Sequence, residues 1–372
     1  MTAPLILISA GGTGGHLFPA EALANALRAA GARVALATDE RVNTLSGSFP
    51  AEEVIAIPSA TPSGRSLPRM ARAGLVLGYG VLRAFPAIRR LKPAAVVGFG
   101  GYPTVPPLFA AARLGVPVVI HEQNGVMGRA NRLLARWATL IATGFPEVRG
   151  IPAGIAAERV HTGNPIRPAV IEAARTPYPE VLKGGKMRLL AFGGSQGARV
   201  MSDVVPAAIE RLPKELYPQL VITQQAREED LLRVRQLYAR LIVAFEAQPF
   251  FRDLPQRIAD SHLVVARSGA STVAELAAIG RPSILVPLPG ALDQDQAANA
   301  ESLAAVGAAL VIPQDGFTPE RLAAEIQAFF DAPERLTRAA AAAKSAGTTD
   351  AAERLAALVL RLAAAHTKDP PR

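Results

Sequence analysis

The sequence has no cysteine among its 372 residues. Disulfide bonds, zinc sites built on thiolates and cysteine nucleophiles are therefore excluded, and the composition suits a reducing compartment. The chain begins MTAPLILISAGG, which lacks the basic region of a signal peptide and holds an apolar run far too short to span a bilayer. We therefore expect a cytoplasmic protein.

Acidic residues are missing from residues 54–121, where seven arginines and one lysine lie. Residues 1–164 hold 16 basic and 8 acidic side chains, whereas residues 165–372 hold 24 and 23. The N-terminal half therefore carries nearly all of the net charge of +9. This distribution indicates that the N-terminal half faces an anionic partner.

At 372 residues the chain is too long for one ordinary core and suits two domains. Short apolar runs such as RLIVAFEA, read as strands, alternate with helical stretches such as the one from about 67 to 91, which is typical of βα units on a parallel sheet. The series occurs twice, and the loops GGTGG from Gly11 and GGSQG from Gly193 mark the repeat. We expect an α/β fold with two Rossmann-like domains facing a cleft, residues 1–164 and 165–372. The sequence leaves open whether the C-terminal helices cross back to the first domain.

Each glycine loop lies between a predicted strand and a predicted helix. Such a turn brings backbone N–H groups close to an anion, and the helix N-terminus adds a favourable partial charge. The dinucleotide fingerprint GxGxxG is not met, because Leu17 and Gln196 stand where glycines are required. Phosphate binding and a merely tight turn both remain open from the loops alone.

Polar side chains follow several predicted strands. In the first half these are His16, Tyr102 and the run HEQN, His121 to Asn124. Because the carboxyl ends of parallel strands meet at one edge of a sheet, we expect these residues to converge on a ligand rather than only to cap turns. In the second half, Glu275 lies one turn inside a predicted helix, where it either accepts the hydroxyls of a ribose or complements the helix dipole.

Seven motifs in order resemble one family. They are GGTGGHLFPA, GFGGYPTVPP, HEQNGVMGRAN, TGNPIR, GGSQGAR, RSGASTVAE and DQDQAANA, and they extend from residue 8 to about residue 300. The sequence resembles the MurG family of N-acetylglucosaminyltransferases. The resemblance implies a GT-B fold and inverting transfer of N-acetylglucosamine from UDP-GlcNAc to the 4-hydroxyl of the muramyl sugar of undecaprenyl-pyrophosphoryl-MurNAc-pentapeptide, a step of peptidoglycan synthesis.

The resemblance also implies which residues bind UDP-GlcNAc and which surround the acceptor. The implied donor-binding residues are Thr13, Gly14, Gly15, Asn124, Arg167, Ser195, Phe251, Ala270, Ser271, Thr272, Glu275, Gln296 and Asn299. His16, Tyr102 and Glu122 are implied at the acceptor. We favour His16 as the general base because histidine is the residue type whose ordinary pKa lies nearest neutral pH, with Glu122 as the rival.

No metal or other cofactor is expected, because backbone N–H groups, a helix N-terminus and Arg167 can stabilise the departing UDP. The sequence DQD at 293–295 has the outline of a metal-binding DxD motif, but the resemblance assigns it to sugar and helix-start contacts.

A long predicted helix has an apolar stretch between Arg72 and Arg83 that is too short to span a bilayer. It is either an ordinary buried helix or one that also docks on an anionic membrane surface. We expect a peripheral enzyme on the cytoplasmic face of the cell membrane, with a cell-wall or division complex as a further partner.

Three other functions stay open. A GT-B epimerase acting on UDP-GlcNAc is the main alternative, followed by a dinucleotide oxidoreductase and a nucleic-acid binder. Few aromatic residues accompany the arginines, which argues against single-stranded nucleic acid, so no nucleic-acid partner is expected.

Overall fold

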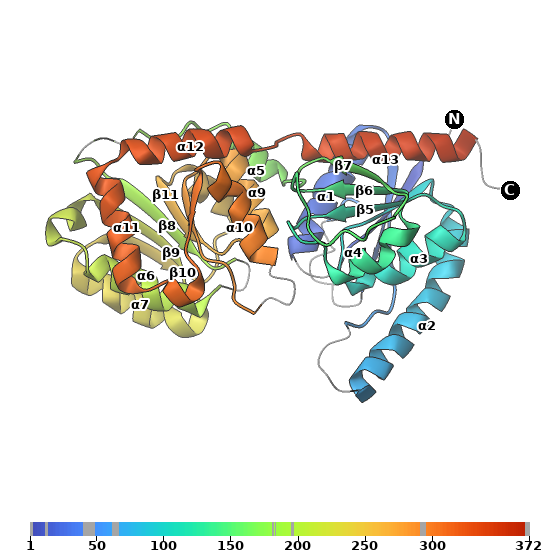
Figure 1. The fold of residues 1–372 in the computed structure, drawn as a ribbon, viewed down its shortest axis with the longest axis horizontal. Helices are drawn as coiled ribbons and strands as arrows, with labels where there is room; N and C mark the ends of the chain where they lie inside the picture. The colour runs from blue at the N-terminus through green and yellow to red at the C-terminus, as the bar shows by residue number, and fades with distance from the viewer. Residues whose placement is uncertain are drawn as a thin grey trace. The chain divides into compact units, whose positions relative to one another are not determined.

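A computed structural model describes residues 3–11, 14–39, 49–61, 67–180, 182, 184–194, 197–290 and 295–368. The chain divides into two compact units, one formed by Met1–Arg167 with Thr349–Arg372 and the other by Pro168–Thr348 (Figure 1). Among the described residues, no helix is both long and apolar enough to cross a membrane.

The described part of the N-terminal unit contains a seven-stranded parallel sheet in the order β3-β2-β1-β4-β5-β6-β7. The strands are β1 (Leu5–Ser9), β2 (Arg33–Thr38), β3 (Glu53–Ala56), β4 (Ala95–Gly98), β5 (Val118–Glu122), β6 (Leu140–Thr143) and β7 (Glu158–His161). The helices are α1 (Gly14–Ala29), α2 (Leu67–Leu91), α3 (Val105–Arg113), α4 (Arg129–Leu134) and α13 (Ala351–Lys368). Buried strands such as β1 and β4 are runs of branched apolar residues, as expected for a sheet covered on both faces.

The described part of the C-terminal unit contains a six-stranded parallel sheet in the order β10-β9-β8-β11-β12-β13. Its strands are β8 (Met187–Phe192), β9 (Leu220–Gln225), β10 (Ala244–Gln248), β11 (Leu263–Ala266), β12 (Ser283–Leu285) and β13 (Ala309–Val311). Its helices are α5 (Pro168–Ala173), α6 (Arg199–Glu210), α7 (Glu228–Leu241), α8 (Leu254–Ala259), α9 (Ala270–Ile279), α10 (Asp295–Ala305), α11 (Pro319–Asp331) and α12 (Glu334–Ala346). Counted within its own unit, the second sheet runs 3-2-1-4-5-6 and the first runs 3-2-1-4-5-6-7, so both have the Rossmann strand order and the first has one further strand.

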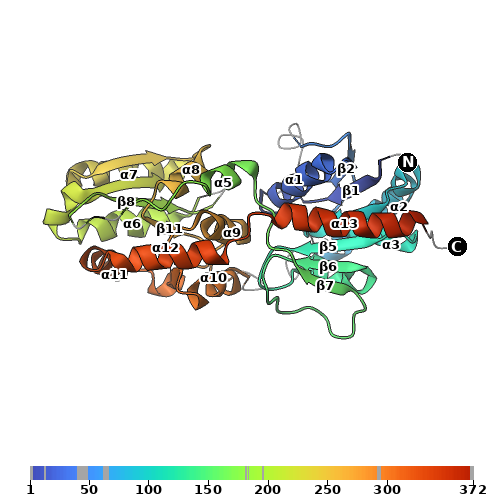
Figure 2. The same ribbon diagram turned by 90° about the horizontal axis from the view of Figure 1, so that it is seen from above.

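The last helix, α13, belongs to the N-terminal unit, where it packs on α1 and β4 (Figure 2). Its apolar stripe includes Leu355 and Val359, both buried in the same cluster as Leu23 and Val97. Helix α13 thus crosses back to the first unit, an arrangement that the sequence left open, and the rest of the chain divides close to the expected 1–164 and 165–372. At the seam, the N-terminal unit extends to Arg167.

Helix α2 packs by a narrow face of small residues, where Ala73, Gly80 and Ala84 are buried. A Cβ atom at Gly80 would lie only 2.1 Å from the carbonyl oxygen of Pro58, so the glycine permits a close approach of the helix to that segment. The opposite face exposes apolar residues, including Leu75 at 76% and Leu82 at 70%.

Candidate active site

The N-terminal site is assembled from the carboxyl ends of three adjacent strands, β1, β4 and β5. His16 lies in the first turn of α1, after β1. Two glycines after β4, Gly100 and Gly101, have φ values of 84° and 75°. Cβ atoms at these positions would lie 3.4 Å from His16 Cε1 and 3.6 Å from His16 Cδ2. The glycines therefore allow the loop to pass directly beside the imidazole ring.

A chain of hydrogen bonds runs from His16 into the core. His16 Nδ1 lies 3.2 Å from Gln123 Oε1, and Gln123 Nε2 lies 3.1 Å from His121 Nδ1. His121 Nε2 lies 3.1 Å from the carbonyl oxygen of Gly163. His121 is fully buried, and this burial lowers its pKa to about 4. The buried end of the chain is therefore a neutral imidazole at neutral pH.

The motif TGNPIR contributes to this network. Besides the Gly163 carbonyl, Asn164 Nδ2 donates to the backbone carbonyl of Gln123 at 2.9 Å, and the Thr162 hydroxyl donates to Gly163 O at 3.0 Å. Of this motif only Arg167 was expected at the site, so the roles of Thr162, Gly163 and Asn164 were missed. The available signal was that three polar or glycine residues directly follow β7, at the same sheet edge as the other loops.

Glu122 is buried, with a relative exposure of 1%, and both its oxygens are occupied. Oε1 accepts from the backbone and side-chain amides of Asn124, at 3.0 and 3.3 Å. Oε2 accepts from Gly128 N at 2.9 Å and from Asn131 Nδ2 at 2.8 Å. Four donors on one carboxylate hold the loop between β5 and α4, which is a structural task distinct from the expected acceptor contact.

Other N-terminal site residues are distributed around this network. Tyr102 begins a 3₁₀ turn and is half-buried against the core under α3. Asn124 is half-buried, and Gly14 and Gly15 begin α1, whereas Thr13 lies outside the described residues. Arg167 stacks over the ring of Phe18 at 4.6 Å. It therefore lies beside α1 in the N-terminal unit.

The C-terminal glycine loop follows β8, the counterpart of β1. Gly193 N donates to Gln225 Oε1 at 3.1 Å, and a Cβ atom at Gly193 would lie 2.2 Å from Ala198 N. Gly194 and Gly197 have φ values of 88° and 68°. The turn therefore depends on glycine both for space and for backbone conformation. Ser195 lies outside the described residues, as do the first two positions of DQD at 293–295.

The start of α9 lies next to this loop in the sheet, because β11 pairs with β8. Gly269 occupies the N-cap position, where it has no side chain to accept a hydrogen bond. No N-cap side chain therefore covers the first backbone amides of α9, those of Ala270, Ser271 and Thr272. Glu275 lies one turn further and is largely buried. A helix N-terminus of this kind suits an anionic ligand.

Gln296 and Asn299 tie α10 to the loops before it. Gln296 Oε1 accepts from Leu288 N at 3.1 Å, and Asn299 Nδ2 donates to the Ser268 carbonyl at 3.1 Å. Asn299 has no exposed surface, whereas Gln296 is half-buried. Asn299 thus positions the segment that begins α9 and does not present its side chain at the surface.

Phe251 is 5% exposed, and the guanidinium of Arg257 covers its ring at 4.2 Å. Arg257 is itself held by Glu246 at 2.6 Å and Asp253 at 2.9 Å. The ring is therefore not an open platform for a base, although the backbone of this segment remains at the carboxyl end of β10.

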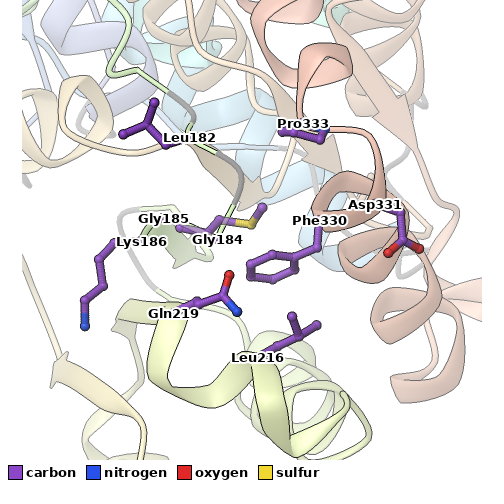
Figure 3. Close-up of a pocket in the computed structure, with 10 residues that line it drawn as sticks. Leu182, Gly184, Gly185, Lys186, Leu216, Gln219, Phe330, Asp331 and Pro333 are labelled. Atoms are coloured by element: carbon purple, nitrogen blue, oxygen red, sulfur yellow. The ribbon is translucent and has the colours of Figure 1, made fainter.

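A small cavity in the C-terminal unit lies elsewhere (Figure 3). It is lined by residues that include Leu182, Met187 and Phe330, and its volume is about 90 Å³. Because Met187 begins β8, the cavity lies at the amino end of the strand that carries the glycine loop at its other end. It is also far smaller than the sites that hold drug-sized ligands, so it is not a nucleotide-sugar site.

Comparison with known proteins agrees with this geometry. Residues 6–143 match the N-terminal domain of glycosyltransferase family 28, and residues 188–355 match the C-terminal domain of that family. These matches and the paired Rossmann sheets define a glycosyltransferase and confirm the expected fold class, α/β of the GT-B type.

Individual relatives narrow the class. The chain is 65% identical over 363 residues to the UDP-N-acetylglucosamine–N-acetylmuramyl-(pentapeptide) pyrophosphoryl-undecaprenol N-acetylglucosamine transferase of Methylorubrum populi, covering 97% of this chain and 98% of the relative. The crystal structure of Acinetobacter baumannii MurG has a TM-score of 0.79 at 30% identity, covering 96% of this chain and 99% of that one. The chain belongs to the MurG family.

The same architecture also occurs in a UDP-N-acetylglucosamine 2-epimerase, whose crystal structure has a TM-score of 0.64 at 13% identity and covers 99% of each chain. At this identity the similarity shows a shared fold only.

Proposed function

We propose that this enzyme transfers N-acetylglucosamine from UDP-GlcNAc to the 4-hydroxyl of the muramyl sugar of undecaprenyl-pyrophosphoryl-MurNAc-pentapeptide, with inversion at the anomeric carbon. The observation that carries the proposal is the 65% identity, over nearly the whole chain, to a transferase named for this reaction. The hydrogen-bonded His16 at the first sheet edge supports it, because the incoming hydroxyl needs a base.

The C-terminal unit would bind the donor. Ser195 with its neighbouring amides, and the α9 residues Ala270, Ser271 and Thr272, would hold the pyrophosphate, while Glu275 would accept from the ribose. The backbone beyond Phe251 would frame the uracil, since the ring is covered. Thr13, Gly14, Gly15, Asn124 and Gln296 would contact the sugar. Arg167 would add positive charge, and Asn299 would act by positioning Ser268.

The N-terminal unit would activate the acceptor. His16 would take the proton of the 4-hydroxyl, with Tyr102 nearby. Glu122 is the weaker candidate for the base because four donors already occupy its carboxylate. The two oxygens of a carboxylate have about four lone-pair sites, and the four donors fill them, so none is left to take the proton of the acceptor hydroxyl.

Turnover should not require a metal, because the amides and positive charges described above would stabilise UDP as it leaves. Treatment with EDTA should leave the rate unchanged. Loss of activity that only magnesium or manganese restores would contradict this part of the proposal.

Because the proposed acceptor is a lipid, the enzyme would lie at the cytoplasmic face of the cell membrane as a peripheral protein. Helix α2 supports this location because Leu75, Tyr79 and Leu82 lie exposed along one side, flanked by Arg72 and Arg83. Apolar side chains and arginines on one helix suit the interface of an anionic bilayer. A cell-wall or division complex would be a further partner.

UDP release is the test of the reaction. The purified protein is given UDP-GlcNAc with and without the lipid-linked muramyl acceptor, and UDP and sugar epimers are measured. Release only in the presence of acceptor is expected. Epimer formation without acceptor would favour the epimerase, and release without acceptor or no release would contradict the transferase.

A further inference from the structure

We propose that Gln123 is a positioning residue that fixes the His16 imidazole in its Nδ1–H tautomer and so leaves Nε2 as the nitrogen that can take a proton. The carbonyl of Gly163 would set this state through His121. The catalytic consequence rests on the proposed function, whereas the tautomer itself does not.

The argument begins at the buried end, because a carbonyl oxygen can only accept a hydrogen bond. His121 Nε2 lies 3.1 Å from Gly163 O, so Nε2 must carry the hydrogen. His121 has no exposed surface and is neutral at neutral pH, which leaves a lone pair on Nδ1. That lone pair requires a donor.

Gln123 provides the donor, and this fixes the orientation of its amide. Its Nε2 lies 3.1 Å from His121 Nδ1 and 2.8 Å from the His121 carbonyl oxygen, so both amide hydrogens have acceptors. The opposite orientation would place Oε1 against two acceptors. Only Oε1 remains to face His16, at 3.2 Å from Nδ1. Because an amide oxygen only accepts, His16 Nδ1 must carry the hydrogen.

The other ring nitrogen of His16 is then the basic one. A Cβ atom at Gly101 would lie 3.7 Å from it, and it makes no hydrogen bond to any residue within the described ranges. The second nitrogen of a histidine is set by the hydrogen bond that the first one makes. Without an acceptor at Nδ1, the ring would be free to hold its hydrogen on Nε2, where it could not receive the acceptor's proton.

Spectroscopy of the free enzyme tests the tautomer without the reaction. The protein has five histidines, so ¹⁵N-histidine spectra can be assigned by comparison with His16→Gln. We expect the wild-type His16 signals, above the pH at which the ring protonates, to be pyrrole-like at Nδ1 and pyridine-like at Nε2. Gln123→Met should move the population toward the Nε2–H form. A wild-type ring already in the Nε2–H form would overturn the proposal, whether or not the variant folds.

Kinetics tests the consequence. Gln123→Met should lower kcat about 10- to 100-fold with little change in KM for UDP-GlcNAc. Gln123→Glu keeps an acceptor at His16 Nδ1, but its second oxygen would face His121 Nδ1 and the His121 carbonyl oxygen, so the folded variant requires a proton on His121 Nδ1. The folded variant should retain more activity than Gln123→Met and move the acidic limb of the pH–rate profile to higher pH. Equal losses in both variants, with no movement of that limb, would indicate a merely structural glutamine and overturn the proposal.

Gln224→Met is the matched control. Gln224 is also fully buried and hydrogen-bonded, donating to Met201 O at 3.1 Å, but it lies in the C-terminal core. Its replacement should leave the His16 tautomer and the pH–rate profile unchanged. If Gln123→Met switches the tautomer while kcat is unchanged, the positioning role stands and His16 as the base fails, which separates the two proposals.

Discussion

The two units have the same strand order, yet the loops at corresponding positions are built differently. The loop after β1 leads to His16, which is backed by buried side chains, among them Gln123 and His121. The loop after β8 is held by Gln225 and lies beside the start of α9, where backbone amides dominate. The first arrangement suits proton transfer and the second suits an anion. The comparison teaches that the Rossmann topology fixes where a site lies, whereas the side chains behind it decide its chemistry.

The surfaces of the two units differ in their charge and in their exposed apolar residues. The C-terminal unit balances its charges in ion pairs, such as Arg233 with Asp203 and Arg257 with Glu246. The N-terminal half carries the excess of basic residues and an exposed apolar helix side. Among the described residues, the N-terminal unit thus combines an exposed apolar helix side with an excess of basic charge, as the proposed docking on an anionic membrane requires.

The largest effect that would sharpen the comparison is expected for Glu122→Gln. Its new amide group would face N–H donors at Gly128 and Asn131, so the free energy of unfolding should fall by about 3 to 4 kcal/mol in urea titrations. Glu53, paired with Arg90 at the surface, is the control, and Glu53→Gln should shift the urea midpoint far less than Glu122→Gln. Wild-type stability with kcat reduced by several orders of magnitude would instead make Glu122 the base.

Acid should destabilise the N-terminal unit through His121. Burial lowers its pKa in the folded protein from the ordinary value of 6.5 to about 4, so the unfolded chain binds a proton first as the pH falls. The contribution of the neutral His121 ring to the free energy of unfolding is fully present above pH 6.5. It is lost as the pH falls toward 4, and the total loss is on the order of 3 kcal/mol.

The single tryptophan, Trp137, reports on this unit. Urea titrations followed by its fluorescence between pH 7 and 4 should show the loss, and His121→Asn should flatten the slope. An identical slope in the variant would contradict the assignment.

The glycine loops should respond differently to alanine. Gly193→Ala would place Cβ 2.2 Å from Ala198 N and should lower the free energy of unfolding by about 2 kcal/mol. Gly15 in α1 has nothing within 4 Å of such an atom, so Gly15→Ala should leave stability unchanged or raise it by about 0.5 kcal/mol. Thermal and urea unfolding compare the two, and equal losses would show that the loops are not built differently.

The smallest effect concerns the membrane. Leu82 of α2 and Leu232 of α7 have exposures of 70% and 69% and lie in different units. Leu82→Ser should weaken binding to anionic vesicles about tenfold, and Leu232→Ser should not. Flotation with anionic and neutral vesicles measures this. Equal effects of the two substitutions, or indifference to lipid charge, would contradict docking by α2.

The fold was predictable where patterns are local. Apolar runs and glycine loops gave the two parallel sheets, and the 67–91 helix matches α2. The position of α13 could not be predicted, because the pattern of an amphipathic helix does not specify which of the two sheets it packs on. Likewise RLIVAFEA was expected to be one strand, but α7 continues to Leu241, Ile242 ends it with φ of 56°, and β10 begins at Ala244.

The sequence predicted which loops form the site, but not what each side chain in those loops contacts. Residues such as His16 and Gln123 were expected to converge, and they do. Whether a polar side chain faces a ligand or the core depends on partners far away in the sequence. For this reason the sequence did not show that Glu122 and Asn299 hold neighbouring loops in place, or that the Gly163 carbonyl binds His121.

The division of labour between the units is tested most directly by His16→Ala, with turnover and UDP affinity measured on the same preparation. We expect kcat to fall about 10²- to 10⁴-fold, while the Kd of UDP from calorimetry stays within about twofold of the wild-type value. Near wild-type turnover, or a loss of UDP binding that matches the loss of rate, would contradict the assignment of proton transfer to the N-terminal unit and donor binding to the C-terminal unit.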